Sequence, residues 1–231
     1  TGAETAERKN RPNTIEKMLN TLNDLDQQLM LWLNHDGGAF QDQLWWILSG
    51  KLTWLPLYAI LLWLLVRLCS PIGRNWKHLV LCVVTVALVV LLADQISSGI
   101  IKHWAQRPRP SQPDSGIAEW IHIVNDYRGG HYGFVSSHAA NTWGIALWFM
   151  LLLRDLRHNA ASNIPHWVFT ANVPALATLA ALNCYSRIYL GVHYPGDILG
   201  GLIVGTCVAL FCYHVAYKRA KKWLKIDEKS A

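Results

Sequence analysis

The sequence predicts an all-α, polytopic membrane protein: a helical bundle of five to six transmembrane helices, with an N-terminal amphipathic helix at the membrane interface. Three observations indicate this class. Of the 231 residues, 52% are hydrophobic and only 16% are charged, whereas soluble domains are typically about 25% charged. Long apolar runs recur along the chain. The 12 Trp and 8 Tyr residues suit a membrane–water interface, where such amphipathic rings collect.

The N-terminal part predicts one amphipathic helix and one short apolar segment. Leu22–Leu33 places leucines at helical spacing beside two Asp residues and a Gln, and the Gly pair after Asp36 ends the pattern. Residues 1–21 are interpreted as a polar tail. Phe40–Ser49 is apolar but brief, so it either extends the next span or forms most of a sixth one.

Longer apolar stretches follow, each close to the roughly 20 residues that a helix needs to cross the hydrocarbon. They are Leu52–Cys69, Leu79–Ile101, Ala139–Leu153, Trp167–Tyr185 and Ile198–Val215. Three prolines predict an extended loop over Gln106–Asp114. We therefore expect a membrane domain over residues 22–217 and a basic cytoplasmic tail over residues 218–231.

Basic residues assign the two sides of the membrane. Threading five spans puts one set of cations on a single face: Arg67, Arg74, Lys77, Arg154, Arg157, Lys218, Arg219, Lys221, Lys222 and Lys225. The positive-inside rule makes that face cytoplasmic. The connectors Lys102–Ser137 and Ser186–Pro195 then lie on the outer face. The basic residues before Leu52 would also be outside, a conflict that a sixth span would remove.

The outer connectors carry polar side chains that a plain turn would not need. These are Lys102, Arg109, Ser136, Ser137 and His138 in the first, and Ser186, Arg187, His193 and Asp197 at the second. If the connectors touch, three cations, small hydroxyl groups and two imidazoles converge. Guanidinium and ammonium groups match the charged oxygens of a phosphoryl group, so this set predicts a phosphate site with a nucleophile and an acid.

The second block also predicts a helix start. Ser136 and Ser137 precede the apolar run Ala139–Leu153, as an N-cap would, and the free N–H groups of such a helix end favour an anion. Because no carboxylate cluster or His spacing is typical of Mg²⁺ or Zn²⁺ ligands, we expect no metal and no cofactor. Arg107 and Arg128 are interpreted as exposed loop charges, since Arg109 alone has both the right distance from Lys102 and a following Pro.

Charge distribution argues against nucleic-acid binding, and cysteine spacing argues against a disulfide framework or a zinc site. The formal charge of +6 could suit nucleic acid, but the basic residues do not form an aromatic-studded stripe. The 5 Cys residues lie in or beside apolar runs without CxxC spacing, so they are interpreted as small hydrophobic residues.

The last span has a face of small residues, formed by Gly196, Gly200, Gly201 and Gly205. This face predicts close helix packing and suggests a homodimer.

In this order, the polar blocks resemble the signature of the type 2 phosphatidic acid phosphatase (PAP2) superfamily, which also includes vanadium haloperoxidases. The blocks are Lys102-x6-Arg109-Pro110, Val135-Ser136-Ser137-His138 and Ser186-Arg187-x5-His193-x3-Asp197. The second block departs from the family pattern Pro-Ser-Gly-His, because Val135 and Ser137 replace the Pro and the Gly. The resemblance covers roughly Leu79–Val215 and implies a helical membrane fold.

The resemblance also implies roles for these residues. His193 would attack phosphorus and form a phosphohistidine, Asp197 would hold the other ring nitrogen of His193, and His138 would protonate the leaving oxygen and later activate water. The phosphate oxygens would be bound by Lys102, Arg109 and Arg187, joined by Ser136 and the backbone amides of Ser137 and His138.

We therefore expect a metal-independent lipid phosphatase of the inner membrane, with membrane lipids around it, its site facing the periplasm or exterior and its C-terminus in the cytoplasm. Undecaprenyl pyrophosphate, phosphatidylglycerol phosphate, phosphatidic acid and lipid A phosphate all remain open as substrates. One alternative is a lipid transporter or flippase that binds anionic headgroups without chemistry. Another is a vanadate-dependent oxidase that uses the same anion site.

Overall fold

The computed structural model describes residues 14–50, 52–69, 76–158 and 166–226. Regular structure in these ranges is helical, apart from one isolated bridge between Pro108 and Tyr132. The predicted all-α class is confirmed. The polar tail before residue 14 and the last residues of the basic tail lie outside the described residues.

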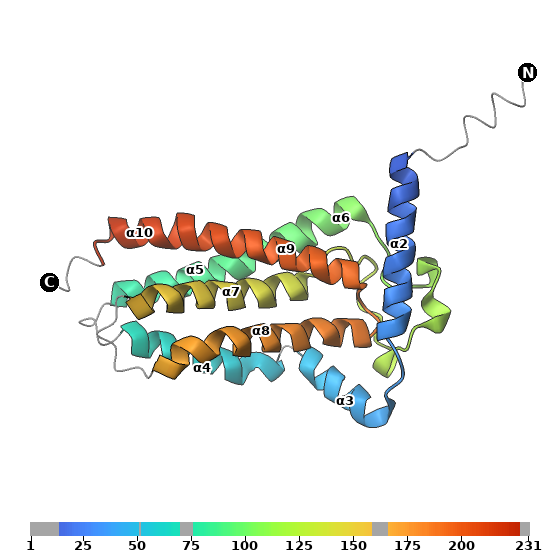
Figure 1. The fold of residues 1–231 in the computed structure, drawn as a ribbon, viewed down its shortest axis with the longest axis horizontal. Coiled ribbons are helices and arrows are strands. Elements are labelled where there is room, and N and C mark those ends of the chain that lie inside the picture. The colour runs from blue at the N-terminus through green and yellow to red at the C-terminus, as the bar shows by residue number, and fades with distance from the viewer. Residues whose placement is uncertain (1–13, 51, 70–75, 159–165, 227–231) are drawn as a thin grey trace, which may run out of the picture.

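α2 (Thr14–Leu33) crosses one end of a bundle of longer helices (Figure 1). It begins before the predicted Leu22 because Ile15, Met18 and Leu19 extend the apolar spacing upstream. Residues 14–21, assigned above to the polar tail, are therefore helical. Most of its apolar side chains are exposed, and Met30 alone is fully buried among them. The predicted helix is therefore present with an earlier start, and its place at a membrane interface stays a prediction.

The remaining helices form the bundle. They are α3 (Gly38–Ser49), α4 (Leu55–Cys69), α5 (Trp76–Asp94), α6 (Lys102–Ala105), α7 (Ser137–His158), α8 (His166–Tyr189), α9 (Pro195–Phe211) and α10 (Lys218–Trp223). π-helical segments join α5 to α6 and α9 to α10 without a break. α7 is central and packs against α5, α8 and α9, where Trp148 and Leu152 are fully buried.

Two continuous segments are long and apolar enough to cross a membrane, Trp76–Ala105 with 30 residues and Pro195–Trp223 with 29. The segments Gly38–Ser49 and Leu52–Arg67 would pass the same test together, but they are bent by 71°. α7 and α8 have sufficient length, yet they carry polar residues such as Asn141 and Asn183. The part of the chain that the structure describes thus has at least two membrane-capable helices, and a count of five to six is not confirmed.

α9 approaches α7 through its glycines. A Cβ at Gly201 would lie 2.5 Å from the Ser136 carbonyl oxygen, and one at Gly205 would lie 2.5 Å from that of Ala140. Real Cβ atoms do not come so close to backbone, so these positions need glycine. This part of the small-residue face is used within the chain, and the homodimer stays a prediction.

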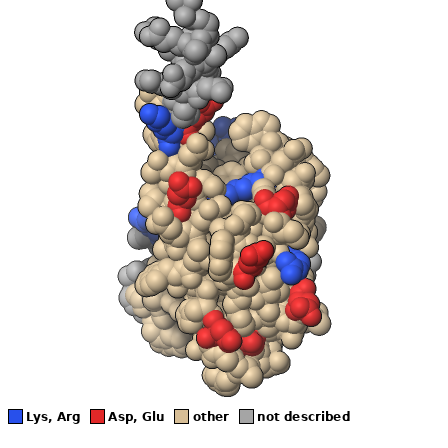
Figure 2. All heavy atoms as spheres, turned by 90° about the vertical axis from the view of Figure 1, so that its right-hand side faces the viewer, with Lys and Arg blue, Asp and Glu red and all other residues tan. Residues whose placement is uncertain are grey.

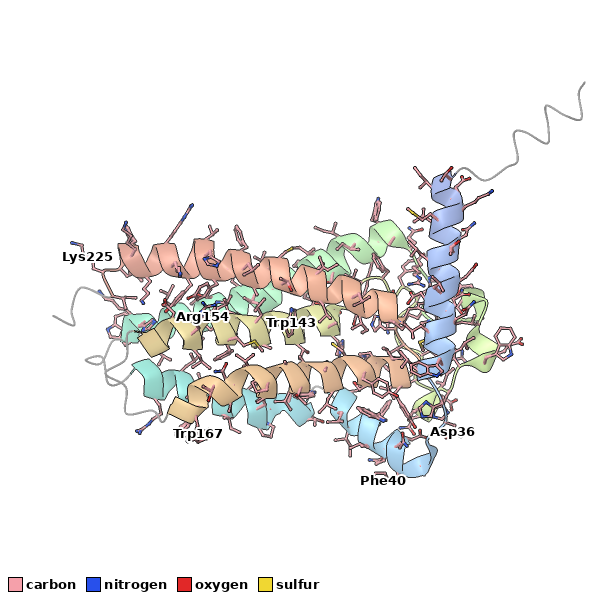
Figure 3. All side chains as sticks on the ribbon, in the orientation of Figure 1. Asp36, Phe40, Trp143, Arg154, Trp167 and Lys225 are labelled. Carbon is pink, nitrogen blue, oxygen red and sulfur yellow. The ribbon has the colours of Figure 1, made fainter. Side chains whose placement is uncertain are left out.

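The two ends of the bundle differ. The connector between α6 and α7 and the turn between α8 and α9 lie at the end crossed by α2, as the predicted threading requires (Figure 1). Figure 3 places Arg154 and Lys225 at the opposite end, and Asp36 and Phe40 near α2. The polar blocks of the sequence therefore gather at one end, away from the basic C-terminal segment.

Candidate active site

The candidate site lies where the first turn of α9 meets the connector before α7. Seen end-on, this part of the molecule has a hollow with Lys or Arg side chains at its edge (Figure 2). The Ser136 N–H donates to the Asp197 carbonyl oxygen over 3.0 Å. A Cβ at Gly133 would lie 2.7 Å from Asp197 Oδ2. The second and third sequence blocks are thus in direct contact.

His193 and Asp197 form a buried pair at the start of α9. His193 is 1% exposed and Asp197 is not exposed. The His193 Nδ1 atom lies 3.2 Å from Asp197 Oδ2, which also accepts the Tyr194 N–H over 3.0 Å. Asp197 occupies the third position of α9, where a carboxylate commonly accepts the N-cap N–H. Because Nδ1 faces the carboxylate, Nε2 is the ring nitrogen directed away from it.

The surroundings favour a neutral His193 ring. Burial holds the pKa of His193 well below its usual value, and the charges of Arg109, Arg187 and Lys102 lower it further, against a backbone hydrogen bond at Gly133. A protonated imidazole cannot attack, so these cations keep the nitrogen lone pair available near neutral pH. All three predicted cations therefore lie close enough to His193 for their charges to lower its pKa.

Two of these cations are buried with donors to spare. Arg109 is 8% exposed and Arg187 is 3% exposed. Arg109 Nε donates to the Tyr132 carbonyl oxygen, and Arg187 Nη1 donates to Ser49 Oγ. Arg109 Nη1 and Arg187 Nε are buried without a hydrogen-bond partner among the described residues. Unsatisfied buried guanidinium donors are costly, and an anion with several acceptor oxygens would satisfy them.

The Ser-Ser-His block forms the predicted helix start. α7 begins at Ser137, and Ser136 Oγ accepts the Ala139 N–H over 3.4 Å, so the N-cap prediction is confirmed. Ser136 is fully buried. Ser137 and His138 line a cavity of about 860 Å³ that extends among apolar side chains of α4, α5 and α7, with Asp94 and Asn141 also in its wall.

Sequence reasoning missed two residues of the site. Arg107, interpreted above as an exposed loop charge, has a side chain only 21% exposed, with Nη1 3.2 Å from Asp197 Oδ1, so that interpretation was wrong. Ser49, at the end of α3, contacts Arg187 across the bundle. The partner of Arg107 is 90 residues away along the chain, beyond the reach of local sequence patterns.

One other cluster has metal-ligand chemistry. Asp36, Asp42 and His122 bring their ligand atoms within 4.8 Å of one another. Asp42 Oδ1 is 2.8 Å from His122 Nε2 and accepts the Tyr189 hydroxyl over 2.7 Å. These contacts tie α3 to the connector and to α8, so the cluster already has a structural role.

Comparison with known proteins identifies the family. The PAP2 superfamily profile matches residues 78–221. The chain is 36% identical over 201 residues to a lipid A 4'-phosphatase of Bacteroides thetaiotaomicron, covering 87% of this chain and 81% of that protein. It is 32% identical over 202 residues to a lipid A 4'-phosphatase of Porphyromonas gingivalis, covering 87% and 77%.

Solved structures share the fold. Aquifex aeolicus LpxE matches with a TM-score of 0.51 and 18% identity, over 82% of this chain and 94% of that one. A PAP2-type phosphatidylglycerolphosphate phosphatase from Bacillus subtilis matches with a TM-score of 0.53 and 16% identity, over 93% and 88%. None of these relatives is described as a transporter. The chain belongs to the PAP2 superfamily and is a membrane lipid phosphatase.

Proposed function

We propose that this protein removes a phosphate from lipid A, with the reaction at the end of the bundle that α2 crosses. Two lipid A 4'-phosphatases align with 87% of the chain, and this near full-length similarity is the observation that carries the choice among lipid phosphates. The same proposal takes His193, His138 and Asp197 as the catalytic group.

The cavity supports a lipid as the substrate. Its volume of about 860 Å³ and its lining by Leu61, Val83 and Ile145 suit hydrocarbon, and its polar wall at His138 suits the part of the lipid next to the phosphate. Cavities of about 300–1,000 Å³ commonly hold ligands. A lipid with its phosphate at His193 could keep an acyl chain in this cavity.

The proposed reaction has two displacements. His193 Nε2 attacks phosphorus while the bond from phosphorus to the lipid oxygen breaks, and His138 gives that oxygen a proton. His138 then takes a proton from water, whose oxygen attacks the phosphohistidine and releases inorganic phosphate and free His193. Asp197 fixes the ring and offsets the positive charge that His193 gains.

The phosphate oxygens would be held by Lys102, Arg109 and Arg187, together with Ser136 and the backbone amides of Ser137 and His138. Charge on these oxygens spreads in the transition state, so fixed guanidinium donors stabilise it more than the ground state. No step in this scheme requires a metal ion. The scheme therefore predicts turnover in the presence of EDTA.

The membrane arrangement is part of the proposal. Five to six spans would cross the inner membrane, with the α2 end at the periplasmic face and the C-terminus in the cytoplasm. The cations Arg154 and Lys225 at the far end of the bundle support this orientation by the positive-inside rule (Figure 3). A homodimer through α9 remains an additional expectation.

Phosphate release in detergent tests the function. The purified protein would be given lipid A, undecaprenyl pyrophosphate, phosphatidylglycerol phosphate and phosphatidic acid, each with EDTA, and mass spectrometry would locate the phosphate lost from lipid A. We expect lipid A to give the highest kcat/KM and His193→Ala to abolish release. A His193→Ala protein that retained activity, or a wild type that preferred another lipid, would overturn the corresponding part of the proposal.

A further inference from the structure

Arg107 joins three parts of the molecule at one guanidinium group. Its Nη1 atom lies 2.7 Å from Asp26 Oδ2 on α2 and 3.2 Å from Asp197 Oδ1 on α9. Its Nη2 atom donates to Asn23 Oδ1 over 3.0 Å. Its Cζ atom lies 3.8 Å from the centroid of the Tyr194 ring, a cation–π distance. The side chain is therefore held from α2 and from the start of α9.

The two oxygens of Asp197 have separate partners. Oδ2 faces His193 Nδ1 and the Tyr194 N–H, while Oδ1 faces Arg107. Asp197 has no solvent exposure. A buried charge is costly unless it is paired and hydrogen-bonded, so the contact with Arg107 stabilises the anionic form of Asp197. Arg107 is therefore placed to restrain the rotation of the carboxylate that has Oδ2 on His193.

A second set of contacts docks α2, which carries Asp26, against the start of α9. Asp26 Oδ1 accepts the Gly196 N–H over 2.7 Å, while Asp26 Oδ2 pairs with Arg107. A Cβ at Gly196 would lie 2.6 Å from Asp26 Oδ2, so α2 and α9 are in close contact there. Met30 is buried one turn further along α2, packed with Tyr194 and Ile198 in the same apolar cluster. α2 is therefore docked at the turn that carries Asp197.

We propose that Arg107 is a positioning residue that fixes the Asp197 carboxylate on His193, and that α2 holds Arg107 in place through Asp26 and Asn23. This inference rests on the proposed roles of His193 and Asp197. α2 then contributes to catalysis even though none of its residues needs to touch the substrate.

Kinetics separate positioning from substrate binding. Outer partners of metal-binding histidines typically contribute about 10–100-fold, and we expect the same range for an outer partner of the carboxylate that orients His193. Arg107→Gln and Asp26→Asn should therefore lower kcat on lipid A by about that factor, with KM and the Ki of inorganic phosphate unchanged within twofold. Arg107→Lys should lose less activity than Arg107→Gln, because lysine keeps the positive charge but lacks the planar guanidinium group with its several donors. The matched control is Asp24→Asn, on an exposed part of the same helix, which should leave kcat unchanged.

A spectroscopic measurement tests the same inference without turnover. In protein labelled with ¹⁵N-histidine, the His193 signals are identified by their loss in His193→Gln, and their shifts report which ring nitrogen carries the proton. We expect one Nδ1-protonated form in the wild type and in Asp24→Asn, and a mixture in Arg107→Gln and Asp26→Asn. Asp26→Asn keeps the shape of the side chain, so this variant still tests the inference if the Arg107→Gln protein does not fold.

The outcomes are distinct. A raised KM and phosphate Ki with unchanged kcat would make Arg107 a substrate ligand and overturn the inference. An unaltered His193 tautomer in both variants would also overturn it, whichever lipid the enzyme prefers. By contrast, activity in His193→Ala would remove the proposed function itself.

Discussion

Replacing Gly201 with Ala should separate the helix that carries His138 from the helix that carries Asp197. The added Cβ would lie 2.5 Å from the Ser136 carbonyl oxygen, whereas ordinary contacts begin at 3.4 Å, so the backbones must part by about 0.9 Å. Misplacement of catalytic groups by about 1 Å can cost on the order of 100-fold in rate. Overpacking of a tight interface typically costs about 1–3 kcal/mol in stability.

Two further substitutions make this prediction specific. Gly205→Ala creates an equal clash with Ala140, but four residues, or about 6 Å, further along α9. It should lower the unfolding temperature as much as Gly201→Ala does, with a smaller loss of kcat. Gly99→Ala meets only the flexible end of Gln95 at 3.3 Å and serves as the control. Phosphate release and thermal unfolding in one detergent check all three. Wild-type turnover by Gly201→Ala would refute the reasoning.

The remaining predictions concern charge and cavity shape. Asp197→Asn should lower kcat by about 10³–10⁴-fold, because an amide no longer stabilises the positive His193 ring; less than a tenfold loss in single-turnover measurements would contradict this role. Arg109→Gln removes a cation that lowers the pKa of His193, so that pKa should rise and the acidic limb of the kcat/KM profile should move to higher pH; a shift to lower pH would show that another group sets the limb. Ala87→Phe narrows the cavity and should raise KM for long-chain lipid phosphates more than for short-chain ones, whereas equal effects on both would place the hydrocarbon elsewhere.

Much of the fold was predictable because its signals are local. Apolar length predicted α5 and α9, and the Ser pair before Ala139 predicted the start of α7. The start of α2 was misplaced because its first turn is a weak continuation of the same spacing. The count of five to six spans was not confirmed, since α7 and α8 carry polar residues such as Asn141 and Asn183, which lower the apolar character of these helices.

The site divides in the same way. The three blocks that resemble the family signature predicted the residues around His193, and the structure brings the second and third blocks into contact. Arg107 and Ser49, the two missed residues of the site, and Asp26 on α2 make contacts that join residues separated by 81 to 138 positions. Such pairs follow from helix docking, which no single stretch of sequence encodes.

The turn before α9 has a consequence for which distortions the site tolerates. The His193 ring and the Asp197 carboxylate are four residues apart at one turn, whereas Lys102, Arg109 and Arg187 lie on separate segments. A displacement confined to the segments that carry the cations would therefore change the phosphate contacts and leave the His193–Asp197 pair together. A displacement of α2, by contrast, would reach that pair through Arg107.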